Sequence, residues 1–321
     1  MKSHKITTLK NKSMIKVLIL GGNGYLGTVF INNFKKKIKL DSPQRRKLNL
    51  FSIKQIDKFF SKNNLNYNII INFCVYQQTG PYLVKNAKQV KDLNNLLNKN
   101  ILYLWKKYLP NSKMISMGAS CAYSPYRKGF SYTKGKLFGG TKDFALSKRI
   151  FAKGCDALFK KFKMKYIILV PGTLIGPGEQ LNAKKMHFFN GGLLRAALYK
   201  NKIKKNFRFI MNRNVIRELS SVDEVSYQIY KILKTKKTGI INLNPNYRIS
   251  LEQFYGLIEN KLKIKKSGNF KSTIFNASIS KSYRVFVKHD FSKKKSIINM
   301  GFLNLFDRTY KYFSKAISKK L

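Results

Sequence analysis

Acidic residues, cysteine and long apolar runs are all scarce in this sequence. It has 13 Asp and Glu against 65 Lys and Arg, and its cysteines stand at irregular positions, Cys74, Cys121 and Cys155. Such cysteine usage argues against a disulfide framework and for a reducing compartment. No apolar stretch has the length needed to cross a membrane. The basic segment 1–13 lacks the apolar core of a secretory signal. We therefore expect a cytoplasmic protein without membrane contact and with a disordered N-terminal tail.

The large excess of positive charge limits the kinds of partner. A net charge of +52 would normally suggest nucleic acid or an anionic surface. Here the lysines are spread along the whole chain among Asn and Ile, and few of them form a basic arm or one helical face. We therefore favour lysine as a general solubilising residue over a nucleic-acid function. The positive field should still attract anionic nucleotide substrates.

The stretch 15–27, IKVLILGGNGYLG, has the strongest local pattern. Its apolar run from Val17 to Leu20 is bounded by glycine, as in a parallel strand that is buried on both faces. Glycines at this place allow a tight turn, a close approach to a pyrophosphate and close packing of the next helix, whose N-terminus faces the phosphates. The pattern predicts a dinucleotide site. The residues expected to form it are Gly21, Gly24, Tyr25, Leu26 and Gly27.

Apolar runs and amphipathic stretches alternate along the rest of the chain. This alternation predicts an α/β fold, a Rossmann doubly wound parallel sheet with a smaller C-terminal substrate lobe. We expect residues 14–180 to form mainly the NAD(P)-binding domain. Residues 181–321 should form mainly the substrate-binding lobe, with some of their elements returning to the sheet. Beyond the first strand, the predicted strands are 67–75, 113–117, 166–170, 207–211 and 239–243, and the predicted helices include 52–63, 90–108, 144–162 and 250–262.

Further motifs follow the glycine loop in a fixed order. They are SCAYSP at 120–125, a lysine near a helix start at Lys148, PGTLIGPG at 171–178, RELSSVDEV at 217–225 and INLNPNYRISLEQ at 241–253. In this order they resemble the extended short-chain dehydrogenase/reductase superfamily, which contains the NAD-dependent epimerases and dehydratases. Within it, the chain is most similar to GDP-L-fucose synthases and related reductases of 4-keto-6-deoxy sugars. The resemblance covers nearly everything from Ile15 onward.

The resemblance implies which residues hold the dinucleotide. The glycine loop would carry the pyrophosphate, and Lys148 would hold the nicotinamide ribose. Arg45 stands where fucose synthases place an arginine on the NADP phosphate, and Asp41 is of the type that binds the ribose of NAD. We therefore predict NADP, with NAD as the alternative. Pro171 and Thr173 would line the cofactor, although Thr173 is equally consistent with a simple turn residue.

Two positions depart from the family pattern, and both affect the chemistry. The catalytic tyrosine that the resemblance places four residues before Lys148 is Phe144, and the Ser or Thr that it places four residues before Tyr123 is Ala119. Neither a phenyl ring nor a methyl group can move a proton to or from a sugar oxygen. Replacement hydroxyls are present at Ser120 and at Tyr132, which begins a second YxxxK string.

Four other positions match, or lie near, family residues that act on the substrate. Cys121 matches a cysteine that serves as one epimerisation acid or base, and His187 lies one residue from the matching histidine. Arg217 matches an arginine that contacts the nucleotide-sugar diphosphate, and Asn182 lies in a loop that would meet the nucleotide. Structural alternatives remain: a small apolar residue at a strand end for Cys121, a surface histidine for His187, and an ion pair for Arg217.

These residues lead to two main functional hypotheses. The first is an NAD(P)-dependent oxidoreductase or epimerase that acts on a nucleotide-linked 4-keto-6-deoxy sugar for surface polysaccharide synthesis, without a metal. The second is a cofactor-binding pseudoenzyme or regulatory protein of the same fold, because Phe144 and Ala119 remove the family hydroxyls. The family also implies a homodimer, formed through two helices that flank the sheet.

Overall fold

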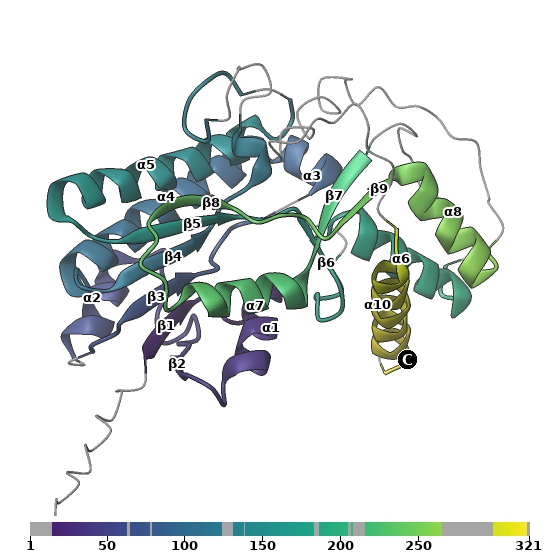
Figure 1. Ribbon diagram of the computed structural model, residues 1–321, viewed down its shortest axis with the longest axis horizontal. Coiled ribbons are helices and arrows are strands. Elements are labelled where there is room, and N and C mark those ends of the chain that lie inside the picture. The colour runs from purple at the N-terminus through teal and green to yellow at the C-terminus, as the bar shows by residue number, and fades with distance from the viewer. Residues whose placement is uncertain are drawn as a thin grey trace, which may run out of the picture.

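The computed structural model describes residues 15–62, 65–77, 79–123, 131–137, 139–182, 186–204, 207, 216–264 and 298–319. In this part, the chain forms a large parallel sheet with helices on both faces, followed by a smaller sheet that packs with three helices (Figure 1). The predicted N-terminal tail and most of the predicted strand 207–211 lie outside these residues. No helix among the described residues is both long and apolar enough to span a membrane.

The large sheet confirms the predicted Rossmann-type fold. Its six strands pair in parallel in the order β2-β1-β3-β4-β5-β8. From β1 the chain steps outward to β2 and then returns to the other side of β1 as β3. Ligands of such sheets bind beyond the carboxyl ends of the strands at this reversal. The strands are β1 (Lys16–Leu20), β2 (Lys39–Asp41), β3 (Ile69–Asn72), β4 (Lys113–Met117), β5 (Tyr166–Val170) and β8 (Gly239–Asn242).

Alternating strand residues fill a core on each face of the large sheet. In β1, Val17 and Ile19 pack on one face, and Leu18 and Leu20 pack on the other. All four are almost fully buried, which explains the unbroken apolar run in the sequence. One face is covered by α1 (Tyr25–Phe34) and α7 (Val222–Ile232), and the other by α2 (Ile53–Ser61), α4 (Ala87–Tyr108) and α5 (Lys142–Phe162).

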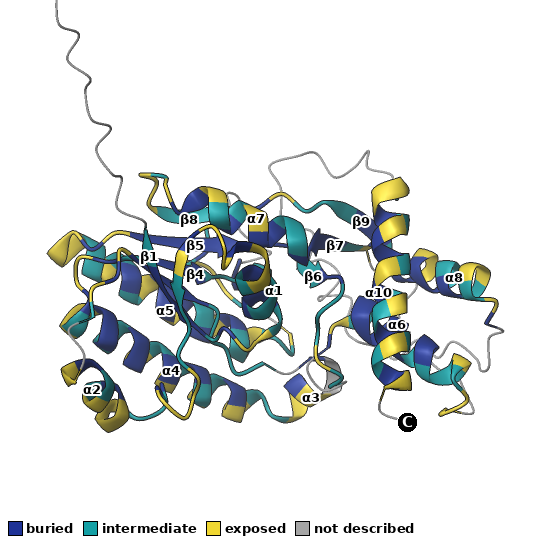
Figure 2. Ribbon diagram, turned by 90° about the horizontal axis from the view of Figure 1, so that it is seen from below, coloured by how far each residue is buried: buried dark blue, intermediate teal, exposed yellow. Residues whose placement is uncertain are grey.

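The C-terminal lobe has its own core, in which aromatic rings from three helices meet. Phe189, Phe254, Phe302 and Phe306 are fully buried there and pack against one another. Figure 2 shows the exposed residues on the outer surfaces of α8 and α10. The elements are β6 (Thr173–Ile175), β7 (Ile216–Ser221), β9 (Tyr247–Ser250), α6 (Phe188–Lys200), α8 (Leu251–Leu262) and α10 (Met300–Ser318).

Candidate active site and cofactor loop

The glycine loop after β1 has the close geometry that its sequence predicts. Gly21 has φ +81°, and its carbonyl accepts a hydrogen bond of 3.0 Å from the N–H of Gly24. A Cβ atom at Gly27 would lie only 2.5 Å from the Gly21 carbonyl oxygen. Helix α1 therefore packs directly on the loop, and its first residues, Tyr25 and Leu26, place their N–H groups at the loop end.

The loop that follows β2 touches the glycine loop. A Cβ atom at Gly22 would lie 2.0 Å from the hydroxyl oxygen of Ser42, so the Ser42 side chain packs directly on the Gly22 backbone. Arg45 is exposed in the same loop, with its guanidinium 5.2 Å from the centre of the Phe51 ring. The Asp41 carboxylate accepts a hydrogen bond from the hydroxyl of Tyr67. The Asp41 carboxylate thus already has a hydrogen-bond partner, whereas Arg45 is exposed beside the Phe51 ring.

A hydrogen-bond network that the sequence did not reveal joins the glycine loop to the C-terminal lobe. The Tyr25 hydroxyl at the start of α1 donates to the Gly176 carbonyl at 2.8 Å. Asn190 on α6 is 1% exposed, and its side chain bonds both the N–H and the carbonyl of Gly176, at 3.2 and 3.1 Å. The same amide donates to the Glu179 carboxylate at 2.6 Å. Asn190 therefore holds the loop after β6 against the helix of the cofactor site.

Glu179 makes this network sensitive to pH. Burial raises the pKa of Glu179 to about 7, and the hydrogen bond from Asn190 opposes this shift. In the unfolded chain the carboxyl ionises near its ordinary pKa of 4.5. The folded state therefore loses stability as the pH rises from 4.5 toward 7, and the loss is complete above that range.

We predict that Glu179→Gln makes the protein more stable than wild type at pH 8, by up to about 3 kcal/mol, because the buried charge is removed. The difference should disappear near pH 4.5, and urea unfolding across this range measures it. Glu252→Gln on exposed α8 is the matched control, with an expected change below about 1 kcal/mol. A difference between Glu179→Gln and wild type that does not depend on pH would contradict the prediction.

Lys148 and two cysteines lie together beyond the ends of β3 and β4. The Lys148 ammonium on α5 donates to the carbonyl of Met117, the last residue of β4, at 3.0 Å. Loss of hydration lowers the pKa of Lys148 to about 8, although the Cys121 and Cys74 thiols nearby oppose this change. Burial raises the pKa of Cys121 to about 11. Cys121 is consequently a neutral thiol at pH 7, which can give a proton but is a poor base.

His187 and Arg217 form a second group, on the side of the C-terminal lobe. The His187 Nε2 atom lies 2.9 Å from the Gln77 side-chain nitrogen, and Gln77 belongs to the same loop after β3 as Cys74. His187 is an exposed residue, as the surface alternative expects, and partial loss of hydration and the positive charge of Arg217 both lower its pKa, so its imidazole is neutral at pH 7. Gln77 is a candidate site residue that the sequence analysis did not single out.

Glu218 and Asp223, the acidic residues nearest to Arg217 in the sequence, each contact another arginine. Glu218 accepts a hydrogen bond of 2.6 Å from Arg248, and Asp223 lies 3.4 Å from Arg308. Arg217 is on β7, one residue from Glu218. Successive residues of a strand point to opposite faces, so Arg217 and Glu218 face opposite sides of the small sheet.

The hydroxyl of Tyr132 is fixed inside the core rather than beside Lys148 on α5. Tyr132 is 3% exposed, and its oxygen accepts a hydrogen bond of 3.0 Å from the Ala119 N–H. Burial raises the pKa of Tyr132. A Cβ atom at Gly118 would lie 2.9 Å from this oxygen, so glycine leaves the space that the hydroxyl fills. Ser120 begins a short 3-10 helix, η1 (Ser120–Ala122), and is half-buried.

The remaining predicted site residues lie around β6. Pro171 is buried before β6, and Thr173 is the first, half-buried residue of that strand. Asn182 donates its N–H to the Gln180 carbonyl at 2.7 Å. The Gln180 amide in turn donates to the Asn23 carbonyl of the glycine loop at 3.3 Å. The segment after β6 therefore runs beside the cofactor loop, as a ligand-binding segment should.

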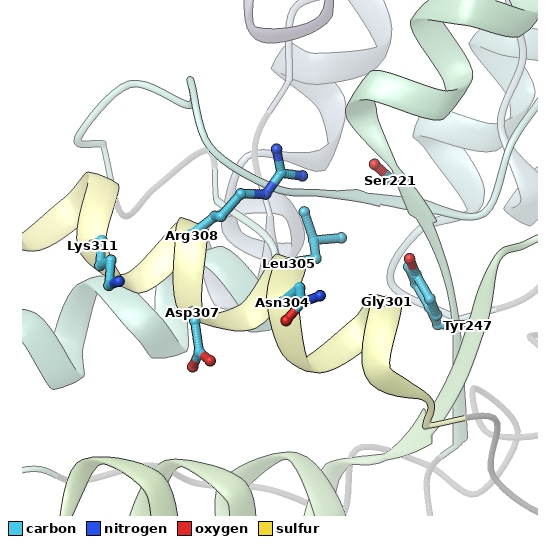
Figure 3. Close-up of a pocket in the computed structure, with 8 residues that line it drawn as sticks. All are labelled: Ser221, Tyr247, Gly301, Asn304, Leu305, Asp307, Arg308 and Lys311. Carbon is cyan, nitrogen blue, oxygen red and sulfur yellow. The ribbon is translucent and has the colours of Figure 1, made fainter.

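A separate hollow of about 570 Å³ lies between α10 and the small sheet (Figure 3). It contains none of the residues predicted from the sequence. Arg308 points toward Ser221, whereas Asp307 projects from another side of α10. Two of its charged side chains are paired with residues outside the lining: Arg308 contacts Asp223 at 3.4 Å, and Asp307 contacts Lys261 at 2.7 Å. Among the described residues, no cluster of His, Cys, Asp and Glu could hold a metal ion.

The fold and the glycine loop define an α/β protein of the dinucleotide-binding class. Residues 17–244 match the model of the NAD dependent epimerase/dehydratase family, and the chain belongs to this family. The resemblance found in the sequence motifs is confirmed at this level. A comparison with curated proteins gave no match.

Several solved structures are similar over nearly the whole chain. A GDP-6-OMe-4-keto-L-xylo-heptose reductase from C. jejuni has a TM-score of 0.72 at 17% identity, covering 94% of this chain and 98% of that one. A GDP-L-fucose synthetase from Naegleria fowleri bound to NADP has a TM-score of 0.72 at 16% identity, covering 97% of this chain and 96% of that one. UDP-glucose 4-epimerase from Thermotoga maritima with UDP-glucose has a TM-score of 0.70 at 13% identity, covering 94% of this chain and 100% of that one. At such identities the similarity establishes the fold.

Proposed function

We propose that this protein is an NADP(H)-dependent oxidoreductase or epimerase of a nucleotide-linked keto sugar. The observation that carries the proposal is that the glycine loop lies beyond the carboxyl end of β1 while Lys148 and Cys121 lie beyond that of β4, with only β3 between these two strands. Similar structures include proteins named as reductases or synthetases of GDP-linked sugars. A 4-keto-6-deoxy sugar used in surface polysaccharide synthesis is the substrate class that we infer.

The described residues fit a dinucleotide. Gly27 leaves room where any Cβ atom would strike the loop, and Gly21 adopts a φ that suits glycine. Arg45 would bind the 2′-phosphate, which favours NADP over NAD, and Lys148 would bind the ribose. Pro171 and Thr173 would line the same pocket. When bound, the reduced nicotinamide would supply hydride to the sugar. Residues 14–180 would thus provide most of the cofactor site, and residues 181–321 most of the substrate site.

The groups around the sugar would have complementary protonation states. The neutral imidazole of His187 can accept a proton, and the neutral thiol of Cys121 can donate one. Such a pair would allow epimerisation at a carbon next to a ketone, if the two groups face opposite sides of the sugar. Arg217 would hold the diphosphate, and Asn182 would contact the nucleotide.

A cofactor-binding protein without hydride chemistry is the second candidate. Phe144 lies one helical turn from Lys148, with its ring centre 5.7 Å from the Lys148 ammonium, and it carries no proton. The backbone N–H of Ala119 is bonded to Tyr132, and its methyl side chain cannot polarise a carbonyl. Tyr132 and Ser120 would have to approach the substrate to replace the missing hydroxyls.

Cofactor titration followed by turnover separates these candidates. Purified protein is titrated with NADPH and NADH by fluorescence and then mixed with GDP-, dTDP- and CDP-linked 4-keto-6-deoxy sugars. Oxidation of NADPH would support the reductase. Solvent deuterium entering the sugar without oxidation would support an epimerase built on Cys121 and His187. Binding with neither result would favour the non-catalytic protein, and failure to bind either cofactor would contradict the proposal.

Exposed apolar residues support a homodimer through α4 and α5. Leu96 on α4 and both Leu146 and Ile150 on α5 are each 40% exposed. We predict that Leu146→Lys combined with Ile150→Lys lowers the dimer fraction at least about tenfold, because lysine leaves water poorly. Sedimentation velocity measures the result, and Tyr227→Lys on α7 is the matched control at another exposed apolar position. A wild-type protein that stays monomeric, or a double variant that still dimerises fully, would contradict the prediction.

A further inference from the structure

The surroundings of the Lys148 ammonium are unusual for a charged group. Lys148 is half-buried, and among the described residues it forms no ion pair with Asp or Glu. Among the described residues, Lys148 donates one hydrogen bond, to the Met117 carbonyl, although an ammonium has three N–H donors. A charged nitrogen that is held away from water without a carboxylate costs stability. Groups of this kind are found mainly at functional sites.

The side chains around Lys148 do not offer an equivalent proton source. Phe144, one turn earlier on α5, presents a ring whose centre is 5.7 Å from the Lys148 nitrogen. Tyr132 is almost fully buried, and its oxygen is bonded to the Ala119 N–H. Burial raises the pKa of both nearby thiols, Cys74 and Cys121, so each holds its proton more tightly than the Lys148 ammonium does. A substrate oxygen that approaches this face of α5 therefore meets an apolar ring and an ammonium side by side.

We propose that the Lys148 ammonium itself donates the proton to the substrate oxygen during reduction. The inference rests on the proposed reductase function. As the carbonyl carbon receives hydride from the reduced nicotinamide, the π bond to oxygen breaks and its electron pair moves to the oxygen. That oxygen forms a bond to a Lys148 proton as the N–H bond breaks. The product is an alcohol, and the neutral amine regains a proton from solvent.

The electrostatics of the site agree with this role. The lowered pKa of Lys148, about 8, keeps most of the amine protonated at neutral pH while making the proton easier to give up. The Met117 carbonyl accepts one N–H, which orients the nitrogen and leaves two donors for ribose and substrate. Reduction should therefore slow as the pH rises above about 8.

The test separates proton donation from cofactor binding. Lys148→Arg keeps the positive charge but holds its proton too tightly to give it up. We expect this variant to lose at least about 100-fold in NADPH oxidation, while its NADPH affinity falls less than about tenfold. Phe144→Tyr combined with Lys148→Arg should recover part of the rate, because a hydroxyl then stands beside the cation. Lys153→Arg, on the exposed side of the same helix, is the matched control and should change neither value.

A second readout does not require turnover. Acylation of the cofactor-free protein over a pH series, followed by peptide mass spectrometry, should show half-maximal reactivity of Lys148 near pH 8. The donor role would be overturned if Lys148→Arg oxidised NADPH at the wild-type rate, or if the double variant recovered none of the lost rate. Either result would leave the proposed reductase function standing. If the wild-type protein oxidises NADPH with no substrate of the panel, the reductase function fails, and the donor role fails with it.

Discussion

Arg248→Met is expected to lower the free energy of unfolding by about 3–5 kcal/mol. Arg248 on β9 and Glu218 on β7 are paired across the antiparallel strands, with 2.6 Å between guanidinium and carboxylate. Their side chains are only 8% and 6% exposed. Removing the arginine leaves a buried carboxylate without its cation, which is the costly case for an ion pair. Urea or guanidinium unfolding followed by circular dichroism measures the loss.

Two further variants define what the Arg248 measurement means. Glu218→Met combined with Arg248→Met should recover much of the stability, because no charge is then left buried. Arg308→Met breaks the exposed pair with Asp223, where the arginine is 60% exposed, and should cost less than about 1 kcal/mol. If Arg248→Met costs no more than Arg308→Met, the buried pair does not stabilise the small sheet. That sheet carries Arg217, the residue proposed to hold the diphosphate.

Gly27→Ala is expected to abolish measurable cofactor binding and to destabilise the fold by about 2 kcal/mol or more. The new Cβ atom would lie 2.5 Å from the Gly21 carbonyl oxygen and 2.8 Å from the Gly22 Cα. Both contacts are with backbone, so the helix must move away from the glycine loop, which is proposed to hold the pyrophosphate. NADPH fluorescence titration and thermal unfolding measure the two effects.

The chain offers a matched control for this substitution. Gly256 lies inside α8, and a Cβ atom there would meet nothing within 4 Å. Gly256→Ala should therefore stabilise the protein by up to about 1 kcal/mol through helix propensity and leave cofactor binding unchanged. If Gly27→Ala binds NADPH as well as Gly256→Ala does, the glycine loop is not the cofactor site.

The parts of the fold that depend on local pattern could be predicted from the sequence. Strands β4 and β5 have the predicted bounds, because both are short, largely apolar segments whose central residues are buried on both faces. Helix α8 starts after Ser250, which accepts from the Gln253 N–H as a capping residue does. The glycine loop was also predictable, because its backbone geometry requires glycine at Gly21 and Gly27.

The parts that depend on distant contacts could not be predicted in the same way. Helix α6 is buried on almost every side, so it lacks the polar face that marks an amphipathic helix. Strand β7 contains the polar sequence RELSS, which does not look like a buried strand. Its Glu218 can be buried because Arg248 neutralises the charge, and that partner is distant in the sequence. The network of Asn190 joins residues from α1, α6 and the loop after β6, and no spacing in the sequence indicates it. The roles of Lys148, Cys121 and His187 remain predictions.

Hydride transfer to a sugar carbon is the central claim, and isotope transfer tests it most directly. The protein would be incubated with NADPH that carries deuterium on the transferable position of the nicotinamide, together with the panel of nucleotide-linked keto sugars. The account predicts that one deuterium appears on the former carbonyl carbon of a sugar product, as measured by mass spectrometry and NMR. Saturating NADPH binding with no deuterium in any sugar would contradict it and would leave a cofactor-binding protein without hydride chemistry.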